Sequence, residues 1–93
     1  MSRHLTPLEV AERIIGSVED ISVLCGYHRK SAYLWRNPSE WRDAGDFPSA
    51  RIMRRLLDYA AEKGLPLTAD HLIRGASAEE IEALLAPDGM AAE

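Results

Sequence analysis

The feature that most constrains this chain is the close spacing of its helix start and stop signals. Thr6-Pro7-Leu8-Glu9 is a capping box with proline at the first helical position, so we expect a helix over 7–15 that stops at Gly16. Ser17 can cap a second helix, which continues through Cys25 and stops at Gly26. Apolar residues recur at helical spacing in both segments, so the N-terminal part of the chain reads as two short helices.

Similar signals divide the rest of the chain, and we see no pattern of a strand anywhere. A third helix should run from about His28 or Arg29 to Asn37, because the residue before Pro38 avoids helical angles. Residues 38–48 read as a loop with at most one short turn. The remaining predicted helices are 50–63 between Ser49 and Gly64, a short one from Thr68 through Ile73, and one from the capping box Ser77-Ala78-Glu79-Glu80 that ends before Pro87.

Length and composition favour one compact all-α domain, a five- to six-helix bundle. The chain has 93 residues, of which 46% are apolar and 28% charged, so it can bury a core. We expect residues 1–75 to form the main domain and 76–93 an acidic helix and tail that pack on it or extend it. No apolar run approaches the roughly 20 residues needed to cross a bilayer, which predicts a cytoplasmic protein with no membrane contact.

Charge is distributed unevenly along the chain. The net charge is −4, yet residues 1–63 hold ten basic and nine acidic side chains, while 64–93 hold one and six. Residues 28–55 include seven basic residues and only three acidic ones. Because nucleic-acid affinity follows the local patch more than the total, a basic middle keeps DNA binding open despite the acidic balance.

The most informative segment lies between Val18 and Asn37, where two short helices are predicted to meet at Gly26. A glycine in the turn can take a positive φ, and a small residue such as Ser22 lets two helices cross closely. Trp35 is placed late in the second helix, where a bulky apolar residue can fix its angle. This arrangement is that of a helix-turn-helix.

The outer face of the helix predicted from 28 to 37 carries side chains that can read DNA. At 100° per residue the polar residues cluster within about 120° on one side, and Ala32 and Trp35 lie opposite. Arginine can bind guanine, asparagine can bind adenine, and tyrosine can contact phosphate or a thymine methyl group. A solvated helix face would show similar residues, but the Gly26 turn and the Trp35 anchor favour the DNA interpretation. The clustered residues are Arg29, Lys30, Tyr33, Arg36 and Asn37.

The segment Ile21-Ser-Val-Leu-Cys-Gly26-Tyr-His-Arg-Lys-Ser-Ala32-Tyr-Leu-Trp35 resembles the helix-turn-helix core of Cro/cI-type phage regulators. It is most similar to the small YdaS-like and carph-isopro domains, in the lambda-repressor-like class. The following Phe47-Pro48, the amphipathic helix and the Gly64-Leu65-Pro66-Leu67-Thr68 ending also fit, so the resemblance covers about residues 8–74. The chain departs from the pattern in a longer loop that carries Trp41, and in Ala32, where valine or isoleucine is more usual.

The resemblance implies that the helix at 28–37 enters the major groove of double-stranded DNA. It also implies a homodimer, because two half-sites multiply specificity, and the dimer surface is then expected after residue 64. By position, the implied base contacts are His28, Arg29, Lys30, Tyr33 and Asn37, and the implied phosphate contacts are Arg36, Arg42, Arg51 and Ser49.

We therefore expect a phage-like or bacterial transcription regulator, acting as a repressor or an activator. The alternative is a protein-interaction module or antitoxin-like adaptor that uses the same fold. Its acidic C-terminal segment could then bind RNA polymerase or another partner, although a solvated last helix is the simpler interpretation of that segment. The sequence shows no grouping of catalytic side chains, no phosphate-binding loop and no set of metal ligands, so we expect neither an enzyme nor a cofactor.

Overall fold

Reciprocal side-chain caps begin the first two helices, where the sequence predicts a capping box at Thr6 and a cap at Ser17. The Thr6 hydroxyl of α1 (Pro7–Ile14) accepts a hydrogen bond from the Glu9 N–H at 3.2 Å, and the Glu9 carboxylate accepts one from the Thr6 N–H at 3.0 Å. Ser17 and Asp20 make the same exchange at the start of α2 (Val18–Leu24). These contacts come from a computed structural model that describes residues 3–86. The predicted stop at Pro87 and positions 87–93 of the acidic segment lie outside the described residues.

The longest helix has the predicted bounds. α3 (Ala50–Lys63) begins at Ser49, whose hydroxyl accepts from the Ile52 N–H at 3.3 Å, and ends at Gly64, which adopts a left-handed φ of 69°. Capping side chains also begin α4 (Ala69–Arg74) and α5 (Ala78–Leu85). Local hydrogen bonds between a cap and the next turn therefore set these boundaries.

A 3-10 helix, η1 (Ser31–Arg36), lies between α2 and α3, so residues 3–86 contain five α-helices and one 3-10 helix. This confirms the mostly helical prediction. None of the helices in that range is long and apolar enough to cross a membrane.

The prediction that the chain contains no strand is wrong. β1 (His4–Leu5) pairs antiparallel with β2 (Ala76–Ser77), with Leu5 opposite Ala76. Gly75 ends α4 with a φ of 75°, and a Cβ at this glycine would overlap the Leu5 carbonyl group. Strands of two residues are too short to show an alternating pattern, so only the tertiary structure identifies them.

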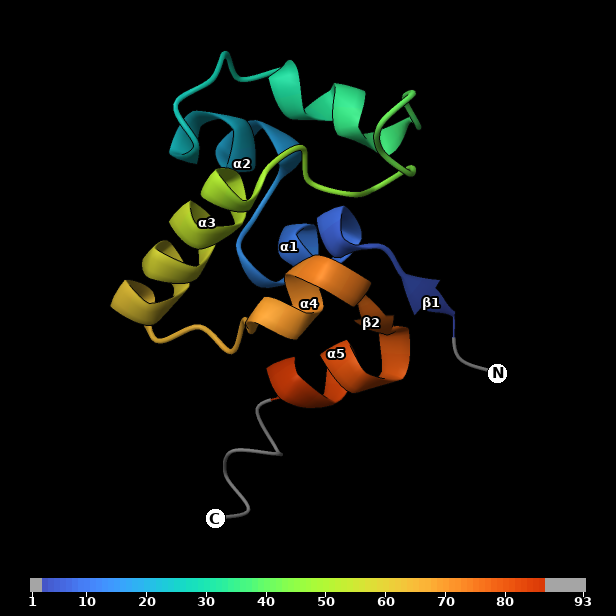
Figure 1. Ribbon diagram of the computed structural model, residues 1–93. Coiled ribbons are helices and arrows are strands. Elements are labelled where there is room, and N and C mark those ends of the chain that lie inside the picture. Colours follow the sequence, from blue (N-terminus) through green and yellow to red (C-terminus); the bar gives the residue numbers. More distant parts are fainter. Residues whose placement is uncertain (1–2, 87–93) are drawn as a thin grey trace.

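The core gathers around α1, which packs against α2, α4 and α5 (Figure 1). In Figure 1, η1 is the green helical segment that crosses the top of the molecule, and α5 lies at the opposite end. The element proposed to read DNA is thus separated from the acidic last helix by the core. The buried apolar residues are Leu5, Leu8, Val10, Ala11, Ile14, Val18, Ile21, Ala32, Trp35, Phe47, Ile52, Leu56, Ala60, Leu67, Leu72, Ala76 and Ile81.

Candidate nucleic-acid interface

A buried serine joins α2 to η1. The Ser22 side chain, fully buried, donates to the Val18 carbonyl oxygen at 3.0 Å and accepts from the Ala32 N–H at 2.8 Å. Between the two elements the chain turns at Gly26, where φ is 86°. The hydroxyl therefore serves a backbone group of each element, and its small size lets them approach closely.

The predicted α-helix over 28–37 is corrected to a shorter 3-10 helix that begins at Ser31. The Ala32 N–H, which an α-helix would direct to the carbonyl group at position 28, is bound instead by the Ser22 hydroxyl. Neighbouring N–H groups bond three residues back, from Ser31 to His28 at 2.9 Å and from Tyr33 to Lys30 at 3.2 Å. A contact made across the turn thus replaces the first α-helical bonds.

This change of period redistributes the side chains around the helix. With three residues per turn, Tyr33 and Arg36 lie on one face, and the Arg36 guanidinium stacks over the Tyr33 ring at 4.9 Å. Ala32 and Trp35 share the buried face. The single polar face predicted at 100° per residue is therefore divided. Leu34, which is 70% exposed, lies on the outer surface of η1.

Three of the predicted base-contacting residues precede η1. His28, Arg29 and Lys30 are exposed on the turn after Gly26, and the His28 Nδ1 accepts from the Lys30 N–H at 3.2 Å. Because Nδ1 is an acceptor here, the neutral His28 ring carries its proton on Nε2. This turn presents a ring N–H, a guanidinium and an ammonium group.

Tyr33, a fourth base-contacting candidate, is bound to α2. Its hydroxyl donates to the Glu19 carboxylate at 2.7 Å. This hydrogen bond lowers the pKa of Glu19 and raises the pKa of Tyr33, since it favours the ionised acid and the protonated phenol. Asn37, the fifth candidate, is exposed at the end of η1.

Two of the predicted phosphate-contacting arginines bind within the protein. Arg36 pairs with Glu12 of α1 at 3.1 Å. Arg42 reaches back to the C-terminal end of η1, where its Nη1 donates to the carbonyl oxygens of Trp35, Asn37 and Asp46 at 3.1–3.4 Å. Its Nη2 donates to a fourth carbonyl oxygen, that of Leu34, at 3.4 Å. The Arg42 guanidinium therefore caps carbonyl groups at the C-terminal end of η1.

The other two phosphate-contacting candidates lie at the start of α3. Arg51 is exposed, and the Ser49 hydroxyl is engaged as the cap. Arg55 lies on the next turn of α3, and its Nε donates to the Leu24 carbonyl oxygen at 3.1 Å. Its i,i+4 spacing from Arg51 is the signal that places both on one side of α3. They line a hollow of about 590 Å³ together with Val23, Leu24, Cys25, Gly26, Tyr27 and Ile52.

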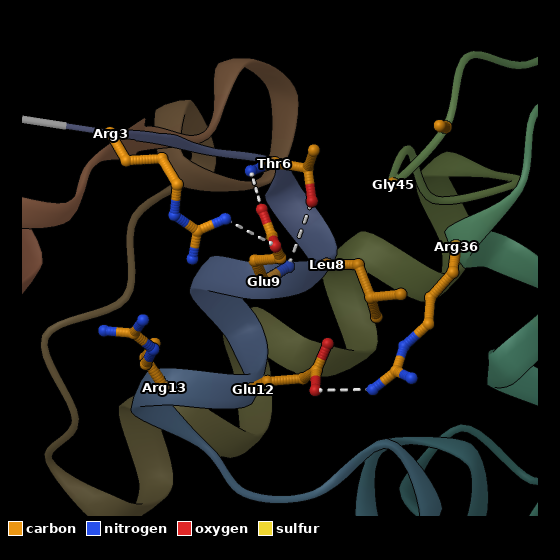
Figure 2. Close-up of a pocket in the computed structure, with 9 residues that line it drawn as sticks. Arg3, Thr6, Leu8, Glu9, Glu12, Arg13, Arg36 and Gly45 are labelled. Atoms are coloured by element: carbon orange, nitrogen blue, oxygen red, sulfur yellow. Dashed lines mark hydrogen bonds and ion pairs between the residues drawn. The ribbon is translucent and has the colours of Figure 1, made fainter.

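A second hollow, of about 410 Å³, joins α1 to the end of η1 (Figure 2). The Arg3–Glu9 and Arg36–Glu12 pairs lie along its wall, each at 3.1 Å, and Arg13 also lines it. Arg36 is 24 residues from Glu12 in the sequence, so the spacing of this pair carried no signal. Two carboxylates offset most of the arginine charge, which makes this hollow a poor match for a strongly anionic ligand.

No known protein family, curated protein or solved structure matches this chain.

Proposed function

We propose that this protein is a sequence-specific regulator of transcription that binds double-stranded DNA, with the turn at 28–30 and η1 in the major groove. The observation that carries the proposal is the buried hydrogen bond between the Ala32 N–H and the Ser22 hydroxyl, behind a turn that exposes His28, Arg29 and Lys30. A helical element fixed from behind, with donors on its outer side, meets the requirement for direct reading of base edges. Occupancy of a promoter would then block or recruit polymerase.

Phosphate contacts in this proposal come first from Arg51, which is exposed beside the turn that follows α2. Arg36 can add a contact if a phosphate competes with Glu12 for its guanidinium. Arg42 supports binding indirectly, because it holds the end of η1. Two copies bound to two half-sites would supply the specificity that one short helix lacks.

Selection of bound fragments from genomic DNA, followed by a salt titration on the best site, tests this proposal. We expect Arg29→Ala to reduce discrimination between the selected site and its single-base variants by about 1–3 kcal/mol. Arg51→Ala should weaken binding to all sequences and lower the log–log salt slope by about 0.9. Arg74→Ala is the matched control, because it removes the same charge from α4, where Arg74 pairs with Asp70.

Two outcomes would contradict the proposal. One is the absence of any enriched sequence. The other is an equal effect of the Arg29, Arg51 and Arg74 substitutions, which would mean that only the total charge matters and that the turn at 28–30 reads no bases.

A protein-interaction module is the second candidate function. It is favoured by the internal bonds of Tyr33, Arg36 and Arg42, which reduce the number of groups free to meet DNA. The acidic residues of α5 lie at the end of the molecule opposite η1 (Figure 1), where they could meet RNA polymerase without obstructing the DNA face. Calorimetric titration of purified polymerase with the protein, in the absence of DNA, tests this candidate.

A further inference from the structure

One tryptophan is displayed on the surface beside η1. Trp41 is 88% exposed, whereas Trp35, the other tryptophan of the chain, is 7% exposed and packs edge-on against Phe47. A lone surface aromatic of this size carries a large apolar area into water, and tryptophan is among the residues that dominate protein interfaces. The DNA proposal assigns no role to Trp41.

The turn that carries Trp41 is held in place by hydrogen bonds. The Ser39 N–H donates to the Arg42 carbonyl oxygen at 2.7 Å, the Arg42 N–H donates back at 3.4 Å, and the Trp41 N–H donates to the Ser39 hydroxyl at 3.3 Å. The Arg42 side chain then fastens this turn to the end of η1. An aromatic side chain on such a turn loses little backbone entropy when it binds a partner.

The charges around Trp41 indicate which kind of partner this side chain can bind. Glu40 and Asp43 are exposed on either side of Trp41 and Arg42, and the Arg42 guanidinium is directed at backbone carbonyl groups. Two free carboxylates would repel the DNA backbone. They would instead favour an apolar pocket with a basic rim.

The chain itself contains a pocket of this chemistry. The hollow of about 590 Å³ between α2 and α3 has apolar walls that include Val23, itself 60% exposed, and Ile52. Among the described residues, Arg51 and Arg55 are the charged residues that line it. Its size falls in the range of sites that accept a single large group.

We propose that Trp41 of one copy inserts into this pocket of a second copy, with Glu40 and Asp43 facing Arg51 and Arg55. Figure 1 shows the turn after η1 and the turn before it on opposite sides of that helix. We assign a head-to-tail arrangement, which leaves each copy with one unused surface, rather than an antiparallel twofold pair. It differs from a twofold dimer formed after residue 64, and it would compete with DNA for Arg51, which the DNA proposal places on a phosphate group.

Sedimentation equilibrium without DNA tests this contact. The weight-average mass should rise with protein concentration, and the tryptophan emission should shift to shorter wavelength, because Trp35 is already buried and only Trp41 can leave water. We expect Trp41→Ala to weaken association at least about tenfold, as a central interface residue does. Ile73→Ala, which truncates a 63%-exposed residue of α4, should have no effect.

A mixing experiment tests whether Trp41 and the pocket are complementary surfaces. Trp41→Ala keeps an intact pocket, whereas Arg51→Glu keeps an intact Trp41 and places a carboxylate at the pocket rim. Neither variant should associate alone, but their mixture should form a one-to-one complex. The double variant Glu40→Arg/Arg51→Glu should recover part of the association that Arg51→Glu loses, because the charges attract again.

Three results would overturn the proposal: a mass that does not change with concentration, loss of association in Ile73→Ala rather than Trp41→Ala, or no complex in the mixture. None of these measurements uses DNA. A failure here therefore leaves the DNA proposal intact, and a failure of DNA binding leaves this contact intact.

Discussion

At the scale of single residues, Ser22 makes the contact on which the candidate interface depends. Its position before Gly26 predicts a small residue at a helix crossing, and the structure places it there, fully buried. The hydroxyl also makes two hydrogen bonds. It donates to a carbonyl oxygen of α2 and accepts from the Ala32 N–H. Alanine would match the size of Ser22 but not these two bonds.

We expect Ser22→Ala to lower the free energy of unfolding by about 1–3 kcal/mol, because the Ala32 N–H would be left without a partner in a dry site. Urea titration followed by circular dichroism measures this loss. Ser39→Ala is the control, since Ser39 is exposed and water can replace its bond to the Trp41 N–H. Equal stability of the two variants would show that the Ser22 bonds contribute nothing.

At the scale of elements, η1 depends on contacts at both ends. Ser22 binds the N–H of Ala32 near its beginning, and Arg42 binds carbonyl groups at its end. A six-residue 3-10 helix has few bonds of its own, so its position relative to α2 follows from these side chains and from buried Trp35. The orientation of the proposed DNA-reading face is therefore a tertiary property.

Arg42→Ala should destabilise the protein by about 2 kcal/mol, because several carbonyl groups lose a charged donor together. Arg42→Lys should recover little of this, since a single ammonium group cannot reproduce the planar fork of a guanidinium. Thermal unfolding of both variants, with exposed Arg54→Ala as the control, measures the difference. If lysine restored full stability, the positive charge of Arg42 rather than its geometry would be what matters.

At the scale of the whole molecule, the antiparallel strands β1 and β2 connect two segments that are far apart in the sequence. Leu5 is fully buried, the Ala78 N–H donates to the Arg3 carbonyl oxygen at 2.7 Å, and the His4 Nε2 donates to the Arg74 carbonyl oxygen at 2.9 Å. These bonds attach the segment before α1 to the segment between α4 and α5. The N-terminal residues thus complete the core beside β2 and α5.

Leu5→Ala should cost about 2–5 kcal/mol, as other truncations of buried leucine do. Amide hydrogen exchange at Ala78 should accelerate in the variant, because its bond to the Arg3 carbonyl group would open with the strand. Exposed Ile73→Ala is the matched control and should change neither quantity. Unchanged exchange at Ala78 in Leu5→Ala would contradict the role assigned to β1.

Most helix boundaries could be predicted because their signals act within one turn. Ser49 and Gly64 bound α3 through bonds that reach at most a few residues along the chain. Arg29 and Lys30 are exposed as predicted, although they lie on a turn before η1 and not on the outer face of an α-helix over 28–37. Such local patterns do not depend on where the rest of the chain goes.

The sequence by itself thus predicted the order of the helices, a total of five or six, and most of their ends. Only the tertiary structure decided that η1 is a 3-10 helix, that Arg42 turns inward, and that buried Gly45 must lack a side chain because a Cβ would overlap Thr6. The physical reason is one of competition. A backbone N–H or a guanidinium can bind many partners with similar strength, and the folded chain brings only one set of partners within reach. The space around a glycine is likewise fixed only when the chain has folded.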